Sequence, residues 1–148
     1  MHKQSSQLIQ EQVSLEIPVS AEQAFQKMCD FPSYIHWQTA ICEVNMEKAH
    51  HITPRVEFVA DVVIRKFRYT LDYSIDHDNL KMSWDFVRGD IEHVSGHFYV
   101  KPKSEKECHA FYALDVDPGF FAPNFLINLI KKTVMVGVLK DLKKELLK

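Results

Sequence analysis

The sequence predicts an α+β fold in which a curved antiparallel sheet packs against a long C-terminal helix. Two observations lead to this prediction. Alternating apolar and polar residues run through about six consecutive segments joined by short polar turns, a pattern typical of antiparallel strands. The last part of the chain, residues 123–148, instead spaces its apolar residues as a helix does. A helix that comes after such strands needs a sheet to lie on, and a ligand cavity can form between the two.

A strand and two short helical segments are expected before the main run of strands. Residues 12–19 alternate between apolar and polar side chains, which predicts a half-buried first strand. Ser20, with Gln23 three residues later, forms a capping-box pattern that starts a helix over residues 21–29. The aromatic-rich residues 31–37 predict a second short helix or a turn.

From residue 40 onward the apolar residues recur with period two. The parity of this alternation reverses before Lys66, so we expect a turn or bulge near residues 63–65. Charged residues alternate to the outside of the predicted sheet. Seven large side chains are expected inside it: Phe58, Tyr69, Leu71, Trp84, Phe86, Phe98 and Tyr112.

The C-terminal helix carries two apolar stripes that point in nearly opposite directions. The first stripe consists of Leu126, Leu129, Ile130 and Thr133. The second consists of Met135, Val138, Leu139, Leu142 and Leu146. One straight helix cannot bury both stripes on one surface, so we expect a kink near Gly137 or a middle that is covered on two sides. The alternative is a patch left for a partner, a membrane surface or a second subunit.

Composition is that of an ordinary globular domain. The 148 residues carry a formal net charge of −2, so no global field points to nucleic acid. Residues 1–12 are polar, and we expect a flexible tail there, with no secretory signal, and then one domain over residues 13–148. The three widely spaced cysteines are expected to be reduced and partly buried, which predicts a cytoplasmic location. No apolar run approaches the roughly 20 residues that cross a membrane.

Three segments carry a family resemblance. They are the helix start at residues 20–25, the aromatic residues 31–37, and the glycine, glycine, aromatic and proline spacing within residues 87–102. Through them the chain resembles the START-like, helix-grip superfamily of polyketide cyclases and lipid-transfer proteins, and within it most nearly the coenzyme-Q-binding family, which includes a bacterial ribosome-association toxin. The sequence departs from that family's pattern at Asp90 and Ile91, where proline and phenylalanine are usual, and at His36, where a proline is usual.

The resemblance covers residues 13–147 and implies a seven-stranded antiparallel sheet that grips the C-terminal helix around a hydrophobic pocket. We expect the ligand contacts to come from the seven inward side chains of the sheet and from Leu126, Leu129, Ile130 and Val134 of the helix. A pocket lined by aromatic side chains with few polar groups suits a quinone, isoprenoid, sterol, acyl chain or polyketide. The alternative is that these side chains fill a close-packed core.

A gate to the pocket is expected at residues 118–125. Phe120, Phe121 and Phe125 lie beside two lysines of the helix, a combination suited to transient contact with an anionic membrane. The alternative is that these phenylalanines fold back onto the core.

No cofactor, metal site or catalytic residue is predicted. His93 and His97 would lie about 13 Å apart on one strand, too far for one ion, and the sequence lacks the spacings of zinc sites. The inward polar tips are tyrosines, and nothing marks one of them as an acid or base. The basic cluster at residues 65–69 is expected to be a solvated hairpin end, so nucleic-acid binding is not predicted.

The sequence therefore predicts a cytoplasmic protein that binds a hydrophobic small molecule, such as a quinone, lipid or polyketide-like compound. Transport of the bound molecule is a further expectation. One alternative is a polyketide aromatase or cyclase, which an inward titrating carboxylate or histidine would favour. Another is a protein that interacts with ribosomes or a membrane complex, which a filled core would favour. The oligomeric state stays open.

Overall fold

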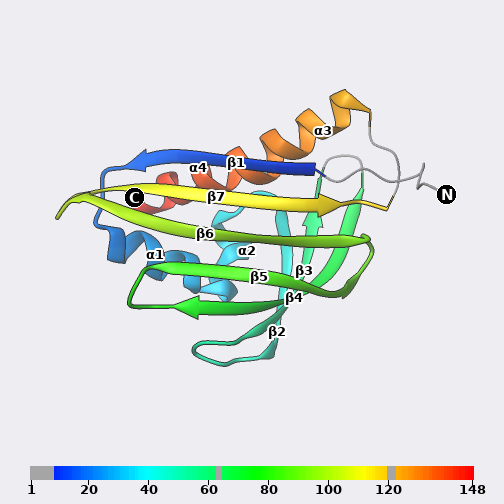
Figure 1. Cartoon of the computed structure of the whole chain (residues 1–148), viewed down its shortest axis with the longest axis horizontal. Helices are drawn as coiled ribbons and strands as arrows, with labels where there is room; N and C mark the ends of the chain where they lie inside the picture. The colour runs from blue at the N-terminus through cyan, green and yellow to red at the C-terminus, as the bar shows by residue number, and fades with distance from the viewer. Residues whose placement is uncertain (1–8, 63–64, 120–122) are drawn as a thin grey trace.

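The computed structural model describes residues 9–62, 65–119 and 123–148. Seven strands form one sheet in the spatial order β1-β7-β6-β5-β4-β3-β2, and every neighbouring pair is antiparallel (Figure 1). Strands β2 to β7 succeed one another as a meander, and β1 closes the sheet against β7. The predicted α+β helix-grip fold is confirmed.

The strands have these bounds: β1 Ile9–Ile17, β2 Ile41–Lys48, β3 Arg55–Asp61, β4 Lys66–Asp76, β5 Lys81–Gly89, β6 His93–Ser104 and β7 Glu107–Asp117. The first strand starts earlier than the expected residue 12. The change of parity before Lys66 is a hairpin connection, in which the Val62 N–H donates to the Arg65 carbonyl at 3.1 Å. Residues 63 and 64 of that connection lie outside the described residues.

Two short helical segments precede the meander, as predicted: α1 (Ala21–Cys29), then the 3₁₀ turn η1 (Phe31–Ser33) that leads into α2 (Tyr34–Trp37). The Ser20 hydroxyl accepts the Gln23 N–H at 3.2 Å and caps α1. Helix α1 buries Ala24, Phe25 and Met28, and it contacts β6, β7 and α4. These contacts close one end of the sheet's concave face.

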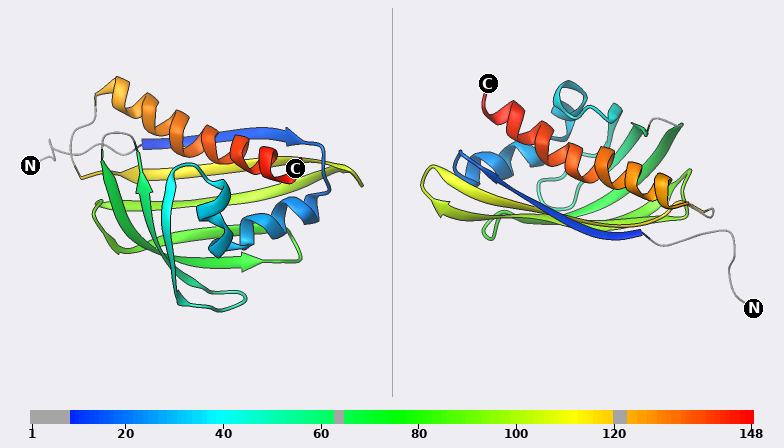
Figure 2. Two further views of the ribbon diagram at one scale, coloured as in Figure 1. Left: turned by 180° about the vertical axis from the view of Figure 1, so that it is seen from behind. Right: turned by 90° about the horizontal axis from the view of Figure 1, so that it is seen from above.

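The C-terminal helix lies over the concave face of the sheet (Figure 2). It consists of α3 (Asn124–Ile130), the π-helical segment η2 (Lys131–Val136) and α4 (Gly137–Leu146). A π-helical turn holds one more residue than an α-helical turn, so it rotates the next section of the helix by about 100°. The segment lies directly before Gly137, and it rotates the two predicted apolar stripes relative to each other. No helix among the described residues is long and apolar enough to cross a bilayer.

One predicted side of β2 is corrected. The sequence predicts that Cys42, which alternates with polar residues as Val44 and Met46 do, is partly buried, but it is exposed. The register of β2 against β3 shifts between Ile41 and Glu43, so Cys42 sits in a bulge and turns outward. The other two cysteines are half-buried (Cys29) and buried (Cys108).

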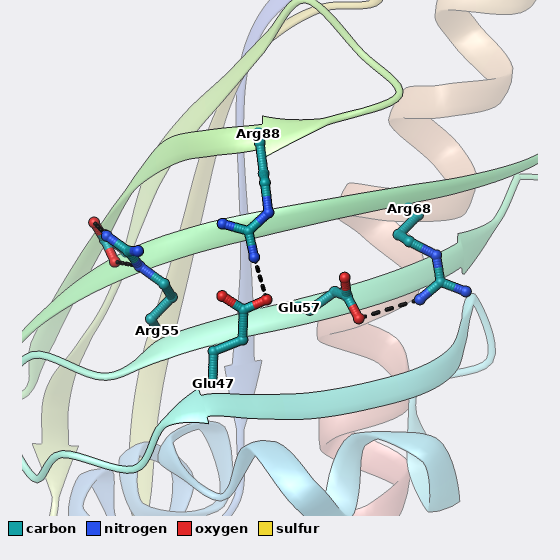
Figure 3. A network of polar contacts seen from close by, with 6 residues as sticks. Glu47, Arg55, Glu57, Arg68 and Arg88 are labelled. Carbon is teal, nitrogen blue, oxygen red and sulfur yellow. Dashed lines mark hydrogen bonds and ion pairs between the residues drawn. The ribbon is translucent and has the colours of Figure 1, made fainter.

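The convex face of the sheet carries ion pairs between its strands (Figure 3). Arg55 makes two hydrogen bonds to Asp72, at 2.7 and 2.9 Å, and Arg68 contacts Glu57 at 3.1 Å. Arg88 reaches across to Glu47 of β2. Since each pair is partly exposed, it contributes little to the stability of the fold. The charged residues of the sheet therefore lie on the face away from the core.

The basic cluster at residues 65–69 lies at the β3–β4 hairpin end, as predicted. The Arg65 guanidinium lies 4.6 Å from the centre of the Phe67 ring, and Phe67 itself is buried. Arg68 also approaches Glu43 at 3.7 Å. The aromatic residues of the cluster point into the core, where they cannot stack on a base.

Candidate ligand-binding site

A cavity of about 120 Å³ lies between the concave face of the sheet and the helices. Strands β3, β4, β5 and β7 supply half of the wall residues, α1, α2, β2, β6, η2 and α4 supply one each, and the others lie in connections. The wall consists of Met28, Tyr34, Gln38, Ala40, Ile41, Phe58, Ala60, Val62, Phe67, Tyr69, Leu71, Tyr73, Met82, Trp84, Ile91, Val94, Tyr112, Leu114, Val116, Pro118, Val134 and Val138. Space for a small group therefore remains between the sheet and the helices.

The size of the cavity limits the ligands that enter it unchanged. An apolar cavity of roughly 150 Å³ holds one benzene molecule, and sites for drug-sized ligands are about 300–1,000 Å³. A volume of about 120 Å³ is therefore slightly smaller than a cavity that holds one ring, so small movements of the wall are needed to admit even a single ring. A larger ligand requires part of the wall to move. Val134 is the wall residue best placed to do so, because it lies on the π-helical segment, where the regular α-helical hydrogen bonds are interrupted.

The wall is uncharged. Among the described residues, those that line the cavity include no Asp, Glu, Lys, Arg or His. Four are tyrosines, and burial raises the pKa of each phenol, namely Tyr34, Tyr69, Tyr73 and Tyr112. All four therefore stay neutral at physiological pH. The Tyr34 hydroxyl also donates to the Met28 carbonyl, so this phenol already has a structural role.

Aromatic rings form a continuous arc along the wall. Trp84 lies 5.6 Å from Tyr73 and 5.4 Å from Tyr112, measured between ring centres. Phe58 lies 5.7 Å from Tyr69 and 5.9 Å from Tyr34. These tilted and stacked rings offer flat apolar surfaces to a ring-shaped ligand.

Gly96 explains part of the predicted glycine spacing. It stands opposite Trp84 in the β5–β6 ladder. A Cβ on this residue would lie 2.2 Å from the Ala113 carbonyl oxygen and 2.9 Å from Trp84 Cζ2. The absence of a side chain thus leaves room for the indole to lie close to β6.

The predicted contact residues divide into three groups. Six line the cavity: Phe58, Tyr69, Leu71, Trp84, Tyr112 and Val134. Three described residues lie elsewhere: Phe98 is fully buried and stacks on Phe25, Phe86 packs beside His93, and Leu129 is half-buried away from the cavity wall. The side chains of Leu126 and Ile130 are not among those that the structure describes.

Sequence reasoning missed several wall residues. Gln38, Ala40, Ile41 and Ile91 lie at strand ends or in connections, where period-two alternation gives no signal. Tyr34 could have been found, because it belongs to the aromatic segment that was recognised. Gln38 is the most informative of them, because it adds a carboxamide to a wall whose other polar groups are tyrosine hydroxyls and the indole N–H of Trp84.

The predicted gate is described only in part. Phe120 and Phe121 lie outside the described residues. Phe125 is 71% exposed at the start of α3, and Pro118, at the other end of the segment, is buried on the cavity wall. Lys131 pairs with Glu11 of β1 at 3.2 Å, so this lysine is partly neutralised.

The histidines have local partners. His50 Nδ1 accepts the N–H groups of Ile52 and Thr53 and organises the β2–β3 turn. His51 and His77 stack with ring centres 4.1 Å apart. Within the described part of the chain, no group of three or more His, Cys, Asp or Glu residues could hold a metal ion.

Comparison with known proteins identifies the fold. No protein family and no curated protein matches the sequence. Among solved structures, a START superfamily protein from Mycobacterium smegmatis superposes with a TM-score of 0.82 at 16% identity, covering 94% of this chain and 99% of the other. The Zhui aromatase/cyclase from Streptomyces sp. R1128 gives 0.81 at 13% identity, over 94% and 93%. Norcoclaurine synthase from Thalictrum flavum, in complex with dopamine and hydroxybenzaldehyde, gives 0.68 at 8% identity, over 97% and 88%.

These identities are low, and the structures share with the chain the arrangement of the sheet around the C-terminal helix. The seven-stranded order, the two short N-terminal helices and the long terminal helix all agree with that arrangement. The chain therefore has the START-like helix-grip fold.

Proposed function

We propose that the protein binds a hydrophobic small molecule in the cavity and carries it without changing it chemically. The observation that supports this most directly is an apolar void within an otherwise packed core, lined by aromatic side chains and by no charged group among the described residues. Burial of apolar ligand surface there supplies roughly 25 cal/mol per Å² before the costs of binding. The ring compounds in the norcoclaurine synthase complex indicate that a helix-grip protein can hold such ligands.

The ligand class includes quinones, lipids and polyketide-like compounds. The resemblance to the coenzyme-Q-binding family supports a quinone, and the likeness to the Streptomyces aromatase/cyclase supports a polyketide-like ring. A cytoplasmic location belongs to the same proposal, and the free cysteines support it, since reduced thiols suit a reducing compartment.

A second candidate is an aromatase- or cyclase-type enzyme, which the likeness to the Zhui enzyme favours. Such an enzyme would need a group that exchanges a proton near neutral pH. Burial raises the pKa of the phenols of Tyr69 and Tyr112, which makes them poor proton donors and poor bases there. This electrostatic setting favours binding over catalysis.

Thermal shift with a panel of quinones, sterols and fatty acids tests the proposal. A ligand present at 100 times its Kd stabilises the native state by about 2.7 kcal/mol. For a chain of this length, that corresponds to a rise in Tm of roughly 5–10 °C. Mass spectrometry of an organic extract of the purified protein identifies any resident ligand. No shift with any compound, together with an empty extract, contradicts the proposal.

Tryptophan fluorescence localises the ligand. The two tryptophans are a matched pair, because Trp84 lines the cavity and Trp37 does not. A quinone in the cavity should quench the fluorescence of the wild-type protein, and Trp84→Phe should remove most of that quenching. Loss of quenching in Trp37→Phe instead would place the ligand elsewhere.

A further inference from the structure

Two buried N–H groups of the cavity wall have no hydrogen-bond partner in the described part of the chain. They are Nε1 of Trp84 and Nε2 of Gln38. Trp84 is 5% exposed and Gln38 is 6% exposed, so bulk water does not satisfy either group. Unpaired buried donors are rare in folded proteins, because burial without a partner carries the full cost of desolvation.

The indole of Trp84 is fixed in place. It is held between the rings of Tyr73 and Tyr112, and its six-membered ring faces the backbone of Gly96. The indole N–H is a donor only. No acceptor for this group is present among the described residues, and an acceptor atom on a molecule bound in the cavity would supply one.

The carboxamide of Gln38 stands on a fixed section of backbone. Its main-chain N–H donates to the Tyr34 carbonyl at 2.8 Å, and its carbonyl accepts the Ile41 N–H at 3.1 Å. The next residue is also held, since the Thr39 N–H donates to Asp141 Oδ2 of α4 at 2.8 Å. The side chain thus enters the cavity from the α2–β2 connection, whereas Trp84 enters from β5.

Trp37 shows the contrasting case. Its indole N–H donates to the Ser33 hydroxyl at 2.8 Å, and this residue does not line the cavity. The fold thus satisfies one indole internally and leaves the other unpaired at the site where a ligand would lie.

We propose that the ligand is an uncharged ring compound that presents at least one oxygen acceptor, a carbonyl or an ether, to Trp84 and Gln38. This inference rests on the proposed binding function and narrows its ligand class. Hydrocarbons would leave both N–H groups unpaired. Carboxylates would bury a negative charge in a wall that offers no cation among the described residues, which is strongly unfavourable.

Three probes of matched shape test the inference with the intact protein. Isopropylbenzene, acetophenone and benzoate each join one ring to a planar or branched three-atom group that carries no oxygen, one oxygen or two oxygens with a charge. Each has a single ring, so each requires less movement of the wall of the cavity of about 120 Å³ than a larger ligand does. We measure binding by NMR titration of ¹⁵N-labelled protein, in which the two tryptophans give two indole N–H signals.

We expect acetophenone to move the Trp84 indole proton downfield, as formation of a hydrogen bond does, and to leave the Trp37 signal in place. Isopropylbenzene should bind without this downfield shift, and benzoate should not bind detectably at pH 7. Equal indole shifts with acetophenone and isopropylbenzene, or benzoate binding as tight as acetophenone binding, would overturn the inference.

Two variants add a thermodynamic test. Trp84→Phe removes the donor and keeps an aromatic ring, and Gln38→Met keeps the length of the side chain without its amide. The Kd ratio of isopropylbenzene to acetophenone should fall about tenfold in at least one variant, as the loss of one hydrogen bond predicts. An unchanged ratio in both variants overturns the acceptor inference. If either variant fails to fold, the NMR titration of the wild-type protein still decides whether the ligand must present an acceptor.

The outcomes separate this inference from the proposed function. If isopropylbenzene and acetophenone bind alike, the cavity is a binding site without acceptor selectivity, and the proposed function stands. If neither probe binds, the inference is overturned, and the thermal-shift panel of larger ligands decides the proposed function independently.

Discussion

Ala60 and Ala110 provide a direct test of the cavity, because both are buried alanines of the sheet with different surroundings. Ala60 on β3 is 5% exposed and lines the cavity, whereas Ala110 on β7 is fully buried in the packed core away from the cavity wall. Substitution by leucine adds three carbon atoms at each position. At Ala60 the added atoms extend into the void, but at Ala110 they meet side chains that are already in contact.

The structure gives opposite expectations for the two variants. Burial of three carbon groups is worth about 2.4 kcal/mol at ~0.8 kcal/mol each, and restriction of the leucine side chain costs roughly 0.5–1 kcal/mol. Ala60→Leu should therefore raise the free energy of unfolding by about 1.5 kcal/mol, which corresponds to a rise in Tm of roughly 3–6 °C. Ala110→Leu should lower the free energy of unfolding by about 1–3 kcal/mol, because overpacking strains a filled core.

Scanning calorimetry of the two variants and the wild-type protein measures these shifts. Titration with a hydrophobic ligand from the thermal-shift panel completes the test, since Ala60→Leu should also weaken ligand binding. Equal destabilisation by both substitutions would refute the reasoning, because it would mean that no usable space exists beside Ala60.

Three further predictions concern other parts of the fold. Burial raises the pKa of Cys29 to about 12, so at pH 8 a thiol reagent should label the exposed Cys42 first and Cys29 only on unfolding; fast labelling of both would contradict the burial. Burial, and then the nearby Lys81, lowers the pKa of His97 from 6.5, so the unfolded state takes up a proton first as the pH falls below about 6.5, and stability is lost there. His97→Gln should reduce the fall in Tm between pH 7.5 and 5.5, and an unchanged fall would exclude this origin. Phe125→Ser should change the free energy of unfolding by no more than about 0.5 kcal/mol, as substitutions at exposed sites do, but should reduce co-sedimentation with anionic liposomes; equal binding by both proteins would remove Phe125 from any membrane contact.

The meander was predictable because its strands obey one physical rule. Each strand is half-buried, so apolar and polar residues alternate, and the turns between them are short and polar. The same rule placed Phe58, Tyr69, Leu71 and Trp84 on the concave face, where they line the cavity. The rule reports which face a residue occupies, but it does not report where a cavity begins and ends.

Two departures show that limit. The ladder between β5 and β6 ends at the Trp84–Gly96 pair, so Phe86 lies beyond it and packs beside His93. Phe98 has the correct parity, but helix α1 covers it with Phe25. Gln38 could not be found at all, because it lies in a connection whose path depends on tertiary contacts with α4.

The sequence predicts a conflict between the two apolar stripes of the C-terminal helix, but it does not predict the π-helical segment. The two apolar stripes of the C-terminal helix predict a kink near Gly137 or a middle that is covered on two sides, and the structure has a π-helical segment directly before Gly137. A wider turn contains one more residue between hydrogen-bonded groups, and it thereby rotates the following section of the helix relative to the preceding one. Sequence periodicity reveals the mismatch, whereas the choice between kink and wide turn depends on packing.

The position of β1 governs the order in which the chain can fold. Its partner is β7, with Ile9 opposite Val116 and Ile17 opposite Cys108, whereas every other strand pairs with a strand next to it in the sequence. During synthesis the hairpins from β2 to β7 can therefore close as each strand emerges, but β1 must wait for nearly the whole sheet. Closing so long a loop is entropically costly, and such non-local pairing slows folding. Docking of β1 is thus expected to be the last strand pairing to form, and β7 remains an open edge, available to other chains, until it does.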